Sequence, residues 1–98
     1  MSGQGEQVKA VVVRIEGRVQ GVWYRGWTVS EATARGLRGW VRNRTDGTVE
    51  ALFAGARADV DAMLEACWQG PPAARVSRVT PRPAEVPERS GFHPLPTT

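Results

Sequence analysis

An arginine behind a glycine-flanked loop is the feature of this sequence best suited to bind a phosphate group. The loop runs from Gly17 to Gly21, and Arg25 follows at the start of a segment that can form a helix. Glycine permits backbone angles closed to other residues, so successive backbone N–H groups can point into one hollow and hold an anion. A helix N-terminus adds unpaired donors, and a guanidinium group matches two phosphate oxygens at once. The spacing alone is therefore compatible with two interpretations. One is a phosphate site, and the other is an ordinary strand-to-helix turn beside a solvated arginine.

Other catalytic arrangements lack their required residues in this sequence. The loop has no Gly-Lys-Ser or Gly-Lys-Thr ending, and Gly17 and Gly21 do not fit the dinucleotide fingerprint. The acidic residues are scattered, with neither paired carboxylates nor the spacing of a metal site. His93, the sole histidine, lies in a proline-bearing segment without a nearby acid and is predicted to be a surface residue. We therefore expect no metal and no cofactor.

The elements that position the loop alternate between strands and helices. Apolar residues at helical spacing from Val60 to Cys67 predict a helix, and β-branched residues alternating from Val11 to Ile15 predict a strand. In all, helices are predicted at residues 22–35 and 56–69, and strands at residues 8–16, 38–43, 48–54 and 75–80. This order is βαββαβ. Right-handed crossovers interleaved in one antiparallel sheet give an α+β, ferredoxin-like sandwich with both helices on one face.

The C-terminal part of the predicted sheet is less regular than the rest. Pro81 and Pro83 follow the fourth strand, so this strand belongs at an edge of the sheet, where a missing N–H does little harm. Phe92 can anchor a short fifth strand. Pro94 and Pro96 limit the pairing of such a strand, so its existence stays open.

Length, charge and cysteine content bound the class of protein. With 98 residues, the chain is expected to form one domain at residues 8–98 after a flexible tail at residues 1–7. The net charge of +3 favours anionic partners in general. No apolar run reaches the length of about 18 residues that spans a membrane, and the first residues do not read as a secretory signal. Cys67 is the only cysteine, so no disulfide can form within the chain, and a reducing, cytoplasmic location is expected. The side chain of Cys67 is expected to be buried.

The tryptophans and a basic run allow a nucleic-acid interpretation, which we consider the weaker one. The four tryptophans are Trp23, Trp27, Trp40 and Trp68. Tryptophans can stack on single-stranded bases, but only Trp40 lies on a predicted strand and the aromatic RNA-binding motif is absent. We therefore expect the tryptophans to pack at helix–sheet edges and around the loop. The basic run consists of Arg38, Arg42 and Arg44, and it is either a solvated strand face or a surface that draws anionic substrates.

Two strings in the sequence resemble a known family. The string from Gly17 to Arg25, GRVQGVWYR, looks like the acylphosphatase phosphate loop and its arginine. The second string resembles the other signature of that family, and the order and separation of the two strings agree. Its residues are Gly39-Trp40-Val41-Arg42-Asn43, then Gly47, Val49 and Gly55. The resemblance covers residues 8–69 well and the stretch GPPAARV after them more loosely.

The resemblance implies hydrolysis of acyl phosphates to a carboxylate and inorganic phosphate, by water attack on phosphorus and without a metal. Arg25 would bind the substrate phosphate together with backbone N–H groups of residues 19–25, and Asn43 would position the attacking water. The phosphate-binding loop would comprise Gly17, Arg18, Val19, Gln20, Gly21, Val22, Trp23 and Tyr24. Tyr24 stands where the family usually has phenylalanine, and its hydroxyl needs a partner or water.

The chemistry of acyl phosphates is compatible with these residues. A carboxylate leaves readily, so no strong general acid is required, and a phosphate oxygen of the substrate can take the proton of the water. Positioning and charge stabilisation then remain, and these dominate phosphoryl transfer. An asparagine carbonyl can accept from a water and aim it, whereas an aspartate would repel the substrate. Apart from the resemblance, a role in the turn at Thr45-Asp46-Gly47 is the simpler interpretation of Asn43.

Two other functions stay open at this point. One is a non-catalytic ferredoxin-like module that binds a phosphate-rich ligand, such as a nucleic acid or a phosphorylated metabolite. The other is a domain of a larger carbamoyl-transfer enzyme, against which the shortness of the chain argues. We expect a monomer that acts on a small-molecule acyl phosphate. The acyl group is not determined, since acetyl, carbamoyl, glycolytic and protein aspartyl phosphates share the recognised part.

Overall fold

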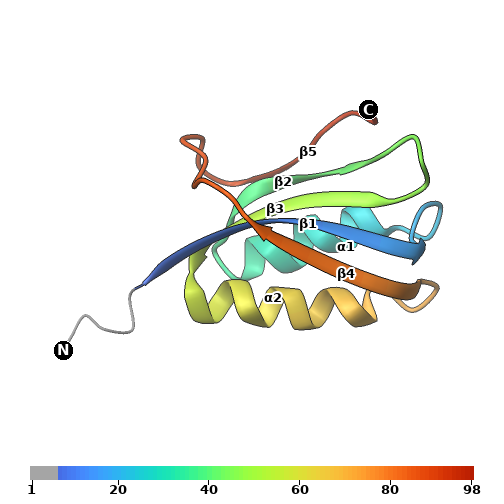
Figure 1. The fold of residues 1–98 in the computed structure, drawn as a ribbon, viewed down its shortest axis with the longest axis horizontal. Coiled ribbons are helices and arrows are strands. Elements are labelled where there is room, and N and C mark those ends of the chain that lie inside the picture. Colours follow the sequence, from blue (N-terminus) through green and yellow to red (C-terminus); the bar gives the residue numbers. More distant parts are fainter. Residues whose placement is uncertain (1–6) are drawn as a thin grey trace.

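A computed structural model describes residues 7–98, and its helices and strands follow the predicted order (Figure 1). The elements are β1 (Val8–Arg18), α1 (Tyr24–Ala34), β2 (Arg38–Asn43), β3 (Val49–Ala56), α2 (Arg57–Gln69), β4 (Arg75–Pro83) and β5 (Phe92–Pro94). The flexible tail predicted for residues 1–7 lies outside the described residues except for Gln7. The backbone carbonyl of Gln7 accepts a hydrogen bond from the N–H of Arg57 over 2.9 Å.

The five strands form one sheet in the order β4-β1-β3-β2-β5, with both helices on the same side (Figure 1). The first three pairings are antiparallel, as the ferredoxin-like sandwich requires. The fifth strand does form, and it runs parallel to β2. β4 is an edge strand as predicted, and it extends through Pro81 and Pro83 because an edge strand forms hydrogen bonds on one side only.

The core lies between the helices and the covered face of the sheet. The inward residues of β1 and β3 are buried at the alternation that the sequence predicts: Val11, Val13, Ile15, Val49, Ala51 and Phe53. From α2, the buried side chains are those of Val60, Met63 and Cys67, and Leu64 is partly buried against them. Both helices are short, at 11 and 13 residues, and within residues 7–98 neither helix could cross a membrane.

Packing accounts for only two of the four tryptophans, which corrects the expectation for the other two. The ring of Trp27 lies 5.2 Å from that of Tyr24, and the guanidinium of Arg42 lies 4.9 Å from the ring centroid of Trp40. Trp23 and Trp68 are exposed instead, at 67% and 49%. Trp68 is exposed because it follows Cys67 and so faces away from the core. The exposure of Trp23 has its origin in the loop before α1.

Candidate active site

The loop between β1 and α1 begins at a bulge that only glycine accommodates. The register between β1 and β4 shifts between Glu16 and Gly17, and Gly17 has a φ of 121°. A Cβ atom at this position would lie 2.2 Å from the carbonyl oxygen of Arg75, so any side chain would collide with the neighbouring strand. Gly21 has a φ of 75° in open space and is required for its backbone angles alone. These two residues bend the chain away from the sheet before the helix starts.

Two buried side chains fix the loop to the body of the protein. Val19 and Tyr24 are each 1% exposed, one within the loop and one at the first position of α1. The hydroxyl of Tyr24 donates a hydrogen bond of 2.6 Å to the backbone carbonyl of Cys67, which supplies the partner that the sequence requires. Burial raises the pKa of the Tyr24 hydroxyl well above its usual range and that of the Cys67 thiol to about 12. Neither group is therefore charged at neutral pH.

Arg25 lies in the first turn of α1 with its charge uncompensated. Its side chain is exposed, and no residue among 7–98 forms an ion pair or side-chain hydrogen bond with it. The helix has no acidic residue in its first turn, and the residue before the helix, Trp23, makes no capping hydrogen bond. The N-terminal N–H groups of the helix and the guanidinium thus offer donors and positive charge at one place.

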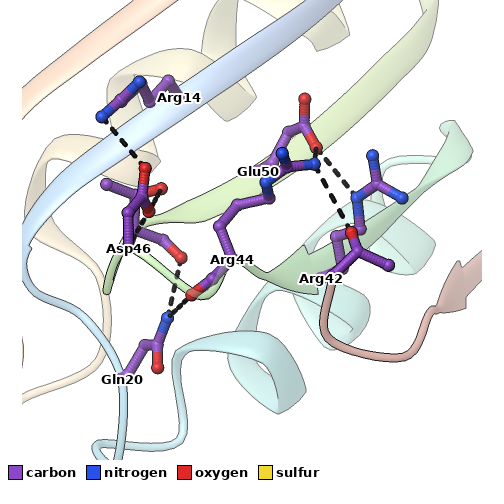
Figure 2. A network of polar contacts seen from close by, with 8 residues as sticks. Arg14, Gln20, Arg42, Arg44, Asp46 and Glu50 are labelled. Atoms are coloured by element: carbon purple, nitrogen blue, oxygen red, sulfur yellow. Dashed lines mark hydrogen bonds and ion pairs between the residues drawn. The ribbon is translucent and has the colours of Figure 1, made fainter.

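Gln20 connects the loop to the hairpin between β2 and β3. Its side-chain nitrogen donates to the backbone carbonyl of Arg44 over 2.8 Å and to that of Thr48 over 2.9 Å (Figure 2). These two carbonyls flank the turn that follows Asn43. We had expected Gln20 only as part of the phosphate-binding loop. No local signal in the sequence reveals the bridge, because both partners are backbone atoms, 24 and 28 residues away.

Asn43 ends β2, and the C-terminal segment holds its backbone. The carbonyl of Asn43 accepts a hydrogen bond of 3.2 Å from the N–H of Thr98, and the Thr98 carbonyl accepts one of 3.1 Å from the N–H of Thr45. The side-chain oxygen Oδ1 of Asn43 is buried, and no residue in the described part of the chain donates to it. An asparagine can exchange the places of Oδ1 and Nδ2 by a half-turn of its amide group.

A cleft of about 420 Å³ brings most of the predicted residues together. It is lined by Arg25 and Asn43, and by Val19, Gln20, Gly21, Trp23 and Tyr24 of the loop. Three residues that the sequence did not single out complete it, namely Gly26, Val29 and Pro94. The predicted loop residues Gly17, Arg18 and Val22 do not line it. Gly17 forms the bulge, Arg18 is exposed at the end of β1, and Val22 packs against the core.

Two further expectations concern residues outside the cleft. His93 does not line it, and its side chain is partly exposed at a position of β5 that pairs with Trp40 of β2. Its Nε2 atom lies 2.8 Å from the carbonyl oxygen of Ser90. Within residues 7–98, no three His, Cys, Asp or Glu side chains gather where they could bind a metal ion.

Comparisons with known proteins agree with this arrangement. The acylphosphatase family model matches residues 11–94 of the chain. An acylphosphatase from Rhodospirillum rubrum is 58% identical over 90 residues, which cover 92% of this chain and 99% of that protein. The structure of an acylphosphatase from Coxiella burnetii superimposes with a TM-score of 0.86 at 34% identity, over 90% of this chain and 93% of that one. Full-length HypF, in a phosphate- and nucleotide-bound form, gives a TM-score of 0.85 at 26% identity, over 98% of this chain but 13% of its own. On this evidence the chain belongs to the acylphosphatase family.

Proposed function

We propose that the cleft formed by Arg25, the loop of residues 19–25 and Asn43 is the site at which this chain hydrolyses acyl phosphates. The family and the names of its relatives support this reaction over a non-catalytic binding module. The observation that carries the assignment of the site is the guanidinium of Arg25, which no described residue neutralises, in the same cleft as Asn43. A phosphate group brings the negative charge that this site lacks.

Arg25 and the backbone N–H groups of residues 19–25 hold the phosphate in this proposal. The guanidinium binds two of its oxygens, and the N–H groups of the loop and the first helical turn bind the remainder. Charge on these oxygens is redistributed as the phosphoryl group is transferred. Donors fixed in place before the reaction stabilise that charge without having to reorganise.

Asn43 orients the water that attacks phosphorus. With its amide turned so that Oδ1 faces the cleft, Asn43 accepts a hydrogen bond from the water. A bond forms between the water oxygen and phosphorus, and the bond between phosphorus and the carboxylate oxygen breaks. The electron pair leaves with the carboxylate, and a phosphate oxygen takes the proton of the water. The products are a carboxylate and inorganic phosphate.

The same chemistry leads us to expect no requirement for a metal ion, since positive charge and N–H donors already face the phosphate. We also place the protein in the cytoplasm as a monomer. The single cysteine is a buried thiol, which is compatible with a reducing compartment.

The test is hydrolysis of acetyl phosphate in water enriched in oxygen-18, with a chelator in excess. We expect rapid release of phosphate that the chelator does not slow, with one labelled oxygen in each phosphate and none in the acetate. Label in the acetate would mean attack on the carbonyl carbon and would overturn the assigned geometry. Absence of turnover by the folded protein would overturn the assignment of the cleft as a hydrolytic site.

A further inference from the structure

Trp23 is a large apolar side chain that the fold leaves exposed beside the catalytic cleft. It is 67% exposed, although the next residue, Tyr24, is 1% exposed. Its neighbours in the cleft include Arg25 and Val29. Within the described part of the chain it takes part in neither of the two aromatic pairs nor in the contact between Arg42 and Trp40. Stacking on another aromatic ring or on an arginine therefore does not explain this side chain.

The local backbone holds the indole in a definite place in spite of its exposure. Trp23 has φ 68° and ψ 24° and is the only residue other than glycine with a positive φ among residues 7–98. This conformation is unfavourable for a residue of its size, and such outliers cluster at functional sites. A Cβ atom on Gly26 would lie 2.1 Å from Nε1 of Trp23, so the indole lies directly against the backbone of the first helical turn. The missing side chain at position 26 makes room for the ring.

With the phosphate held by the loop and Arg25 as proposed, the acyl part of the substrate would extend toward the open side of the cleft. In-line attack places the leaving carboxylate on the side of phosphorus away from the water, and therefore away from Asn43. The loop encloses the phosphate, so the acyl group lies beyond it, at the rim. Trp23 is the exposed large apolar side chain in the lining of the cleft. A flat indole face is suited to an aromatic or bulky apolar group.

We propose that the indole of Trp23 is a platform for the acyl group, which makes this protein selective for acyl phosphates with an aromatic or bulky apolar acyl group over acetyl phosphate. This inference rests on the proposed function, because it takes the phosphate to be bound by the loop and Arg25. It assigns Trp23 a role in specificity through its side chain, distinct from the backbone N–H that the loop contributes to phosphate binding.

The experiment compares kcat/KM for benzoyl phosphate and acetyl phosphate in the wild type and in Trp23→Ala. We expect the benzoyl-to-acetyl ratio to fall about tenfold, which is within the range for one apolar contact in a specificity pocket. Trp68→Ala is the matched control, since Trp68 is also exposed but does not line the cleft, and its ratio should not change. Trp23→Phe keeps a ring and should retain most of the preference.

A disturbed loop is distinguished from a lost platform by a second variant and a second measurement. Glycine accepts the left-handed backbone of position 23, so Trp23→Gly removes the ring without strain. Competitive inhibition by inorganic phosphate reports on the loop and should be unchanged in this variant. If both substrates lose kcat/KM equally in Trp23→Ala and Trp23→Gly, or if the ratio does not change, the platform is refuted.

Failure of the proposed function can be separated from failure of the platform by binding alone. Benzoylphosphonate and acetylphosphonate resemble the two substrates and cannot be hydrolysed at phosphorus, and calorimetry gives their dissociation constants. A preference for benzoylphosphonate that Trp23→Ala abolishes supports the platform even in a protein without turnover. Equal binding of the two phosphonates by the wild type refutes it, whether or not the chain hydrolyses acyl phosphates.

Discussion

The candidate cleft and a groove on the uncovered face of the sheet are nearly equal in size but differ in the surroundings of their arginines. The cleft has a volume of about 420 Å³ and the groove about 430 Å³. In the groove, Arg14 forms an ion pair with Asp46 at 3.2 Å, and Arg44 forms one with Glu50, also at 3.2 Å (Figure 2). Arg25 in the cleft has no such partner among residues 7–98. Volume does not distinguish the two regions, and Arg82 of the groove also has no ion pair among residues 7–98. The cleft differs because its unpaired arginine lies in the first turn of a helix and in the same cavity as Asn43.

The ion pairs also decide between the two interpretations of the basic run beside Asn43. Glu50 accepts from both Arg42, at 2.9 Å, and Arg44, and Arg42 also lies over the ring of Trp40. An anion that binds these arginines must compete with a carboxylate that is already in place. We therefore assign Arg42 and Arg44 to the surface of the sheet and expect these two arginines to contribute little to the capture of substrate.

The largest effect that separates the two regions is expected from Arg25→Ala. This variant should lower kcat/KM for acetyl phosphate by about 10³-fold or more, as happens when an arginine that stabilises a phosphoryl transition state is lost. Arg14→Ala is the matched control from the groove, and its kcat/KM should remain within about twofold of the wild type because its exposed ion pair contributes little. Steady-state kinetics, with circular dichroism to verify folding, measure both. Comparable losses in the two variants would contradict the distinction.

Asn43→Ala tests the other side of the cleft and is expected to have the next largest effect. We expect kcat to fall by about 10²-fold, by analogy with the loss of one group that acts in the transition state. Inhibition by inorganic phosphate should change far less than in Arg25→Ala, since Asn43 acts on the water rather than on the phosphate. In Asn43→Asp, repulsion between carboxylate and phosphate should weaken inhibition by phosphate as well. Weaker phosphate inhibition in Asn43→Ala than in Arg25→Ala would reverse the assigned roles.

Gln20→Ala tests the link between the cleft and the hairpin that borders the groove. The loss of two hydrogen bonds to backbone carbonyls should lower the free energy of unfolding by about 1–2 kcal/mol. Activity should fall by about tenfold, because a misplacement of catalytic groups by about 1 Å is costly even when no group is removed. Urea unfolding and steady-state kinetics measure the two effects. Gln69→Ala at the exposed end of α2 is the control and should change neither.

The order of the first four strands and the two helices could be predicted because it depends on local periodicity. The fifth strand depends on its neighbour instead. Two backbone hydrogen bonds flank β5: the N–H of Gly39 donates to the carbonyl of Gly91 over 3.1 Å, and the N–H of Leu95 donates to the carbonyl of Val41 over 2.8 Å. Pro94 and Pro96 have no backbone N–H, but neither of these bonds requires one from them.

The site shows the same division between local and distant causes. The loop, Arg25 and Asn43 could be selected from motif strings that are contiguous in the sequence. The exposure of Trp23 could not, because a left-handed backbone overrides the packing expected of an apolar residue. The bridge from Gln20 and the contribution of Pro94 were also out of reach, since each depends on a chain segment distant in the sequence.

The smallest effect concerns the ionisation of Asp46 in the groove. Hydrogen bonds from the hydroxyl and N–H of Thr48 lower the pKa of Asp46, and the charges of Arg14 and Arg44 add to this. Because the pKa of Asp46 is lower in the folded state than in the unfolded state, the ionised carboxylate stabilises the folded protein. This stabilisation is complete above the unfolded-state pKa and is lost as the pH falls through the folded-state pKa. Thr48→Val removes the hydroxyl donor, so the pKa of Asp46 should rise toward its usual value, as carboxyl NMR titration can measure.

A salt titration of Thr48→Val identifies what holds the remaining shift. Arg14 and Asp46 are both exposed, so an effect of charge should weaken as salt is added, whereas the hydrogen bond from the N–H of Thr48 should not respond. If the pKa of Asp46 in Thr48→Val stays as low as in the wild type and rises only with salt, the arginines hold it. If the pKa rises on loss of the hydroxyl alone and does not respond to salt, the hydrogen bonds from Thr48, rather than the charges of Arg14 and Arg44, hold the pKa of Asp46 low.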